Sequence, residues 1–243
     1  MEVIKRIIIL LLPILLVSCS EQTDVSLEEF EIEEDVFVSG KALMSLGYGL
    51  HPLEEQSGNH EILLIGVHGS ESRGYEWVYP LQTLDTPETL TLFFRWNDKK
   101  CPGPSYEKLY SSIDLLLQSN ANLKEVVVIG HSYGALLVSM FLSEWSKDTP
   151  LAVHAIAGPL AGMPSINSLC LYNPPNLINN NVKFYEWRTI QALDGAFRDL
   201  NYDPQIVEIK KSAVTRLPET YKGNKLGHNW SISWVADEIK KTN

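Results

Sequence analysis

The sequence predicts an α/β fold in which a mostly parallel sheet carries helices on both faces. Three observations favour this class. Short apolar runs recur at regular intervals, several of them are apolar at odd and even positions alike, and segments of helical period lie between them. A strand that is apolar at every position is buried on both faces, as in a parallel sheet. Alternating strands and helices then give a layered fold with right-handed crossovers.

The expected elements follow one another along the chain. A short antiparallel hairpin is expected at residues 36–38 and 42–46. Strands are expected at residues 62–67, 90–96, 126–129, 153–157, 182–190 and 206–209. Apolar residues at helical spacing predict helices at residues 106–118, 135–145 and 230–241. Only about 25 residues separate the fourth strand from the fifth, so no large cap domain is expected there.

Composition narrows the class of protein. The 243 residues are 44% apolar and 21% charged, which is typical of one globular domain with a sizeable core. A net charge of −10 argues against a nucleic-acid partner. The sequence has no Cys-x-x-Cys pair and no histidine cluster at metal spacing, so no metal site is expected. Whether Cys101 and Cys170 form a disulfide is left open by their spacing alone.

The first nineteen residues have the pattern of an export signal. Lys5 and Arg6 precede an apolar run at residues 7–17, which is too short to span a bilayer as a helix. The run ends in Leu-Val-Ser-Cys, which resembles the lipobox of bacterial lipoproteins. The resemblance implies that residues 1–18 are a signal peptide, and that an acylated Cys19 anchors the chain on the periplasmic or cell-surface side of a membrane. An ordinary export signal with a chance cysteine is the alternative.

Residues 19–35 are expected to form the lipid anchor and an acidic tether. Eight acidic residues and no basic residue lie in residues 20–35. Such a segment repels itself and stays extended, either as a spacer from an anionic membrane or as a linker without a function of its own. The remaining residues, 36–243, are expected to form the folded domain.

A Gly-x-Ser-x-Gly pentapeptide at residues 130–134 is the strongest chemical signal. It lies between an expected buried strand and an expected apolar helix, the setting that a nucleophile elbow requires. A serine on so sharp a turn crowds its neighbours, so Gly130 and Gly134 are expected to be needed because they lack side chains. The turn presents Ser132 Oγ at the carboxyl edge of the sheet, where the helix N-terminus favours developing negative charge.

With this motif the chain resembles the α/β-hydrolase superfamily, in particular its serine esterases and lipases, over roughly residues 60–243. The resemblance implies a nucleophile, an acid and a histidine in that chain order. Of the six histidines only His228 follows every candidate acid, and it precedes the last expected helix. We therefore expect His228 to take the proton of Ser132 Oγ and to return it to the leaving group.

Two aspartates are candidates for the acid. Asp194 follows the expected strand at residues 182–190, at the end where the superfamily places its acid, and it is therefore preferred. Asp203 is the alternative, because a shift of one strand in the assignment would favour it. The pair of residues 194 and 195, Asp-Gly, is also common in turns.

The resemblance also implies an oxyanion hole made of two backbone N–H groups. Tyr133, the residue after the nucleophile, is the first expected donor. His68 and Gly69 follow an early strand and look like the superfamily's His-Gly motif, so Ser70 is the second expected donor, with Gly69 as the alternative. His68 is expected to shape this loop rather than to act in catalysis.

Apolar and aromatic residues near this edge are candidates for the substrate pocket or for the core. They are Tyr75, Trp77, Tyr79, Trp96 and residues 158–164. Together, the motif and the resemblance predict a serine hydrolase that cleaves carboxylic or thio esters of a small molecule or lipid. The reaction is expected to pass through an acyl-serine intermediate and to need no cofactor. An amidase or peptidase on the same residues is one alternative. A binding lipoprotein that retains the fold is the other.

Overall fold

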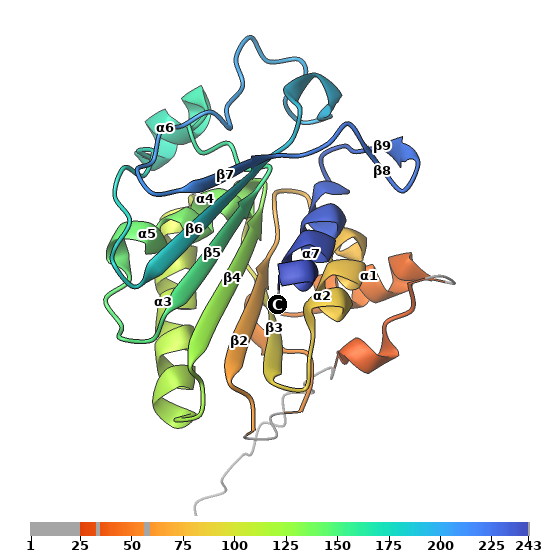
Figure 1. Ribbon diagram of the computed structural model, residues 1–243, viewed down its shortest axis with the longest axis vertical. Coiled ribbons are helices and arrows are strands. Elements are labelled where there is room, and N and C mark those ends of the chain that lie inside the picture. The colour runs from red at the N-terminus through yellow and green to blue at the C-terminus, as the bar shows by residue number, and fades with distance from the viewer. Residues whose placement is uncertain (1–24, 33–34, 56–58, 243) are drawn as a thin grey trace, which may run out of the picture.

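The computed structural model describes residues 25–32, 35–55 and 59–242 (Figure 1). Seven of the described strands form one sheet, in the order β1-β3-β2-β4-β5-β6-β7. Their bounds are β1 (Gly49–Pro52), β2 (Ile62–Val67), β3 (Thr89–Arg95), β4 (Glu125–His131), β5 (Leu151–Ile156), β6 (Val182–Arg188) and β7 (Ala213–Arg216). β1 runs antiparallel to β3, and the other neighbouring pairs are parallel. The expected mostly parallel sheet is confirmed.

Helices cover both faces of the sheet, as expected (Figure 1). One face carries α1 (Val36–Ser45), α2 (Tyr75–Leu84) and α7 (Ser231–Thr242). The other face carries α3 (Pro102–Ser119), α4 (Tyr133–Ser139) and α5 (Phe141–Glu144). Each layer has its own apolar cluster against the sheet. The short helix α6 (Pro164–Cys170) lies in the connection from β5 to β6, and no large cap is present there.

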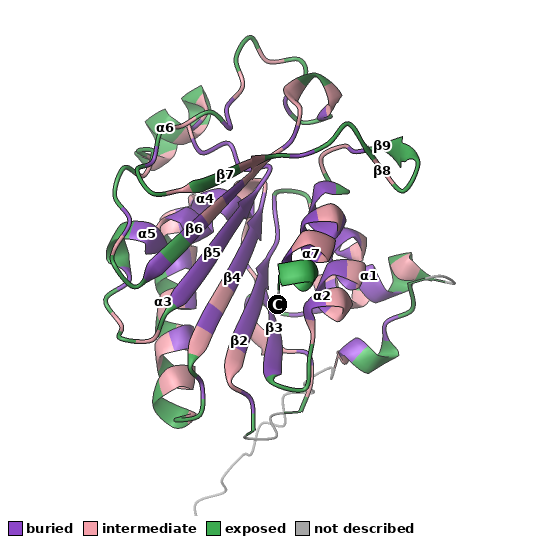
Figure 2. Ribbon diagram, in the orientation of Figure 1, coloured by how far each residue is buried: buried purple, intermediate pink, exposed green. Residues whose placement is uncertain are grey.

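Burial is deepest in the middle of the sheet (Figure 2). Every residue of β5 is buried, whereas β6 alternates and β7 is mostly exposed. A strand covered by helices on both faces is buried at nearly every position, which is why β2 and β5 are almost wholly apolar. The carboxyl ends of the parallel strands are therefore held in place by a closely packed core.

The expected lead-in hairpin is wrong, because residues 36–45 form the helix α1. The Asp35 carboxylate accepts a hydrogen bond from the Val38 N–H at 3.1 Å and so caps the helix. The antiparallel strand comes next, as β1.

The expected strand at residues 206–209 is also wrong. Ile206 is 48% exposed and this segment forms no ladder, while the last strand of the sheet is β7. The sequence of β7, Ala-Val-Thr-Arg, has only one large apolar residue, which is why the pattern missed it.

Residues 75–84, where no helix was expected, form α2. Trp77 is fully buried, and its ring meets Phe93 with centroids 5.8 Å apart. Trp77 therefore belongs to the core, which settles its two candidate roles. The expected helix at residues 135–145 is divided at Met140 into α4 and α5.

The described part of the expected tether, residues 25–32, packs against the domain. The 3₁₀ helix η1 (Leu27–Glu29) places Leu27 and Phe30 in the core, and their carbonyl oxygens accept hydrogen bonds from Gln82 Nε2 on α2. Self-repulsion does not keep this stretch extended, because its apolar side chains are buried. The expected signal peptide and Cys19 lie outside the described residues. No helix within those residues is long and apolar enough to cross a membrane.

Candidate active site

Ser132 occupies a strained turn between β4 and α4. Its backbone angles are φ 53° and ψ −121°, a conformation that side-chain-bearing residues rarely adopt. Its N–H is held by the Ile156 carbonyl at 2.9 Å. The expected strand, sharp turn and helix are therefore present at the pentapeptide, with Ser132 at the corner.

The two glycines of the pentapeptide are sterically required. A Cβ on Gly130 would lie 2.5 Å from the Gly134 carbonyl oxygen and from Val138 Cγ2. A Cβ on Gly134 would lie 2.5 Å from the carbonyl oxygens of Val67 and His68. Because the obstacles are mostly backbone atoms, a side chain at either position would displace the turn.

Asp194 and His228 are brought together across 34 residues. Asp194 follows the 3₁₀ helix η2 (Gln191–Leu193), and His228 follows the small hairpin of β8 (Thr220–Tyr221) and β9 (Asn224–Lys225). His228 Nδ1 donates to Asp194 Oδ2 at 2.9 Å, and the two side chains are 14% and 0% exposed. Since a carboxylate only accepts, this bond leaves Nε2 of the neutral ring as the free base.

The Asp194 carboxylate is fully satisfied. Burial raises its pKa, but hydrogen bonds from His228, Thr189 and the Ala196 N–H outweigh burial and hold the pKa below its usual range. The group is therefore an anion at neutral pH.

Asp203, the alternative acid, does not contact His228. Its Oδ1 accepts from the Gln205 N–H and from Gln205 Nε2, and its Oδ2 lies 3.3 Å from Arg216 Nη1. Of the two candidate acids, the structure brings only Asp194 to the histidine.

His131 joins the elbow to the histidine loop. Its ring lies 4.6 Å from the ring of His228, and its Nε2 donates to the His228 carbonyl at 3.1 Å. Burial and the neighbouring His228 lower the pKa of His131 well below its ordinary value, so its ring is neutral. Ser132 follows His131 directly, but its Oγ makes no hydrogen bond to the residues that the structure describes. Bonds from a nucleophile to its base often form only in the substrate complex.

The loop expected to supply the second oxyanion donor lies against Ser132. A Cβ on Gly69 would come within 2.8 Å of Ser132 Cβ. Tyr133 is the first residue of α4, so its N–H has no carbonyl partner inside the helix. Tyr133, the first expected donor, and Gly69, the alternative second donor, therefore lie directly beside Ser132, and Ser70 follows Gly69 in the chain.

His68 shapes this loop through a fixed tautomer. Arg95 Nη1 donates to His68 Nε2 at 2.7 Å, so the proton of the neutral ring sits on Nδ1, which donates to the Gly69 carbonyl at 2.7 Å. Burial lowers the pKa of His68 to about 4, which keeps the ring neutral. The Gly69–Ser70 peptide bond is planar and trans. Because the Gly69 carbonyl points toward His68 Nδ1, the Ser70 N–H points away from His68.

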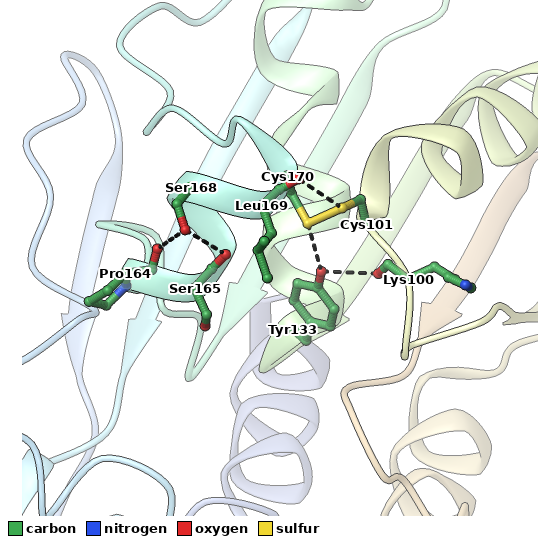
Figure 3. Close-up of a disulfide and its surroundings, with 8 residues drawn as sticks. All are labelled: Lys100, Cys101, Tyr133, Pro164, Ser165, Ser168, Leu169 and Cys170. Atoms are coloured by element: carbon green, nitrogen blue, oxygen red, sulfur yellow. Dashed lines mark hydrogen bonds between the residues drawn. A yellow bond between two sulfur atoms is a disulfide. The ribbon is translucent and has the colours of Figure 1, made fainter.

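Tyr133 contacts the ring of Trp96, the Lys100 carbonyl and a disulfide, and Figure 3 shows the last two of these contacts. Its ring lies 5.1 Å from that of Trp96, and its hydroxyl donates to the Lys100 carbonyl at 3.1 Å. Cys101 and Cys170 form a disulfide, which settles the question of their pairing, and Cys170 Sγ lies 4.0 Å from the Tyr133 hydroxyl. The bridge ties α6 to the loop before α3, beside the expected oxyanion donor.

Comparisons with known proteins identify the architecture. No family model and no curated protein matches the sequence. The esterase domain of a Rhodothermus marinus protein is 14% identical, with a TM-score of 0.52 over 79% of this chain and 89% of that one. Est1E from Butyrivibrio proteoclasticus with ferulic acid bound is 13% identical, with a TM-score of 0.53 over 79% and 92%. An α/β serine hydrolase without a lid, from Xanthomonas campestris, is 12% identical, with a TM-score of 0.50 over 79% and 85%.

The chain has the α/β-hydrolase fold. In this fold the elbow serine lies after a central strand, which here is β4 with three neighbours on either side in the sheet. The single short helix α6 between β5 and β6 adds no domain over the site.

Several residues around the α/β-hydrolase elbow have no sequence signal of their own. Thr189 and Gln205 behind Asp194, and Arg95 behind His68, are polar residues in no recognisable motif. His131 had one available signal, its place inside the pentapeptide. Among residues 25–32, 35–55 and 59–242, no three His, Cys, Asp or Glu side chains are arranged to hold a metal ion.

Proposed function

We propose that this chain is a serine hydrolase that cleaves carboxylic or thio esters, with Ser132, His228 and Asp194 as its triad. The strained backbone of Ser132 carries the proposal, because strain at a strand-to-helix corner is costly and serves to expose the hydroxyl. The Asp194–His228 hydrogen bond supplies the oriented base. The resemblance to esterases and serine hydrolases of the same fold supports this choice over an amidase.

The reaction follows from these positions. His228 Nε2 takes the proton of Ser132 Oγ as the oxygen attacks the substrate carbonyl, and the Tyr133 and Ser70 N–H groups bind the resulting oxyanion. Collapse expels the alcohol or thiol, which receives the proton from His228, and leaves an acyl-Ser132. A water molecule, deprotonated by His228, then releases the acid and restores the serine.

Labelling with a fluorophosphonate probe tests the nucleophile. Wild-type protein should be labelled at Ser132, and Ser132→Ala should lose the label, since the probe needs an activated serine. Ser143→Ala on α5 is the matched control and should be labelled like wild type. His228→Ala should lower the turnover of p-nitrophenyl esters by about 10³-fold or more. Strong labelling of Ser132→Ala at another serine would contradict the assignment.

A panel of substrates separates the alternatives. Esters of rising chain length should be hydrolysed faster than matching amides. Preference for amides would favour an amidase or peptidase. Inertness toward probe, esters and amides would favour a binding protein.

We also propose that the chain is a lipoprotein anchored through Cys19 outside the cytoplasm. The Cys101–Cys170 disulfide supports export, because disulfides persist mainly in oxidising compartments. Mass spectrometry of the native N-terminal peptide should find an acylated Cys19. Cys19→Ser should move the protein from the membrane to the soluble fraction. An unmodified Cys19 would contradict the anchor and leave the hydrolase proposal untouched.

A further inference from the structure

Two buried polar side chains behind Asp194 take no direct part in the proposed reaction. Thr189 follows β6, Gln205 lies in the loop before β7, and each is 1% exposed. The Thr189 hydroxyl donates to Asp194 Oδ2, the same oxygen that accepts the proton of His228 Nδ1. A buried polar group costs free energy unless it is hydrogen-bonded. The specific hydrogen bonds of these two side chains therefore indicate a role at Asp194.

Gln205 forms hydrogen bonds to both polar backbone groups of Thr189. Its Oε1 accepts from the Thr189 N–H at 2.8 Å, and its Nε2 donates to the Thr189 carbonyl at 3.1 Å. A residue on an adjacent antiparallel strand would form the same pair of hydrogen bonds with its own backbone N–H and carbonyl. Because the backbone of Thr189 is fixed, its hydroxyl is held in the direction of Asp194.

Asp203 and Arg216 set the orientation of the Gln205 amide. Nε2 also donates to Asp203 Oδ1 at 2.9 Å, and a carboxylate only accepts. The reversed amide would turn its oxygen toward Asp203 and the Thr189 carbonyl, and its NH₂ toward the Thr189 N–H. Arg216 Nη1 donates to the Thr189 carbonyl and lies 3.3 Å from Asp203 Oδ2, which closes the network.

The Thr189 hydroxyl has one proton and two acceptors within reach. Gln205 Oε1 lies 3.1 Å from Thr189 Oγ1, and Asp194 Oδ2 is the other acceptor. Hydrogen bonds to a charged oxygen are the stronger ones, so the proton goes to Asp194. The Ala196 N–H occupies Oδ1 at 2.8 Å, so the carboxylate is held at both ends.

We propose that Thr189 and Gln205 are positioning residues for the acid–base pair. Gln205 fixes Thr189, and the Thr189 hydroxyl holds Asp194 Oδ2 toward His228 Nδ1. This inference rests on the proposed hydrolase function of Ser132. It also gives Asp203 a defined place, as the group that orients Gln205 rather than as the acid.

Substitution of Thr189 tests the inference by kinetics. Thr189→Val keeps the shape and removes the hydroxyl, so kcat for ester hydrolysis should fall roughly 10- to 100-fold, the effect of one hydrogen bond to a charged group. KM should stay within about 2-fold, because Thr189 does not line the proposed reaction path. Thr189→Ser keeps the hydroxyl and should recover most of kcat. Gln205→Glu, which turns an acceptor toward Asp203, should lower kcat in the same way.

Thr91→Val is the matched control. Thr91 is also fully buried and its hydroxyl donates to Asp85 Oδ1 at 2.6 Å, but it lies near the amino end of β3. This variant should lose stability and keep its kcat. Equal kcat losses in Thr189→Val and Thr91→Val would make the role of Thr189 merely structural and would overturn the inference.

Proton NMR gives a readout that does not need turnover. The His228 Nδ1 proton in its bond to Asp194 should give a low-field resonance in wild type, Thr189→Ser and Thr91→Val. In Thr189→Val the resonance should move or broaden. An unchanged resonance together with wild-type kcat in Thr189→Val would overturn the inference. If wild type hydrolyses no ester, the proposed function fails, and the resonance alone decides the role of Thr189.

Discussion

Ser132 holds a backbone conformation that costs a residue with a side chain of order 1–3 kcal/mol. The surroundings fix this conformation, since Gly130 and Gly134 leave room for the carbonyl groups that pack against the turn. Strain kept in this way is typical of functional positions, where one group must project from a sheet edge. The backbone of Ser132 therefore gives the strongest support for the proposed catalytic role.

The choice of acid is tested by two isosteric substitutions. Asp194→Asn should lower kcat by about 10⁴-fold, because the amide favours the wrong tautomer of His228. Asp203→Asn should cost no more than roughly 10-fold, since an asparagine oxygen still accepts from Gln205. Ester turnover measures both variants. A larger loss in Asp203→Asn would reverse the assignment.

Sequence reasoning could name candidate site residues only where they belong to a motif or follow from the order of elements along the chain. Ser132, the glycines and His228 follow from a pentapeptide and from chain order, and Asp194 follows from the end of one strand. Thr189 and Gln205 carry no such signal, because their role depends on which loops meet behind β6. Only the folded chain brings their polar atoms together.

At the scale of elements, the disulfide decides where α6 lies. None of the residues of α6 is buried, and Leu169 within it is 80% exposed. Apart from Ile166, which packs against the core, α6 buries little apolar surface, and the bridge from Cys170 to Cys101 holds it beside Tyr133 (Figure 3).

Removal of the bridge should lower the stability of the domain. The sequence separation of 69 residues predicts a loss of about 4 kcal/mol in Cys101→Ser with Cys170→Ser, chiefly because the unfolded chain gains freedom. Urea denaturation measures this loss. Wild type treated with dithiothreitol should match the double variant, and the variant should not respond to the reductant. Equal stability with and without the bridge would contradict the prediction.

The central strands of the sheet were predicted well, and the errors lie outside them. The bounds of β2 are those expected, and the buried strands β3, β4 and β5 shift by only a few residues. The errors fall at α1, α2 and β7. A capping aspartate outweighed the apolar pairs at residues 36–38, and β7 has too few apolar residues to be seen.

At the scale of the whole molecule, buried histidines make folding sensitive to acid. Burial lowers the pKa of His68 to about 4 and that of His154 to about 3. Burial and the neighbouring His228 also lower the pKa of His131 well below its ordinary value. Below about pH 6.5 the unfolded chain protonates these residues while the folded chain does not. Their stabilising contribution is therefore complete above pH 6.5 and falls as pH drops toward 4. Glu54, whose pKa burial raises to about 7, acts in the opposite sense.

The free energy of unfolding should accordingly fall between pH 7 and pH 5. We expect a loss of roughly 1–2 kcal/mol for each of the three buried histidines, partly offset by Glu54. Urea denaturation at a series of pH values measures the slope. His154→Gln keeps an acceptor for Trp187 Nε1. This variant should reduce the pH dependence of the free energy of unfolding by the contribution of one histidine. A slope identical to that of wild type would contradict the assignment for His154.

The order of the parts along the chain has a consequence for biosynthesis. His228 comes 96 residues after Ser132, and α7, which follows it at Ser231–Thr242, must pack on α2 to close its layer of the sheet. A nascent chain that has passed the elbow thus contains the proposed nucleophile but not yet the proposed base. The proposed activity therefore stays silent during translation, and it begins only when residues up to 242 have emerged and folded.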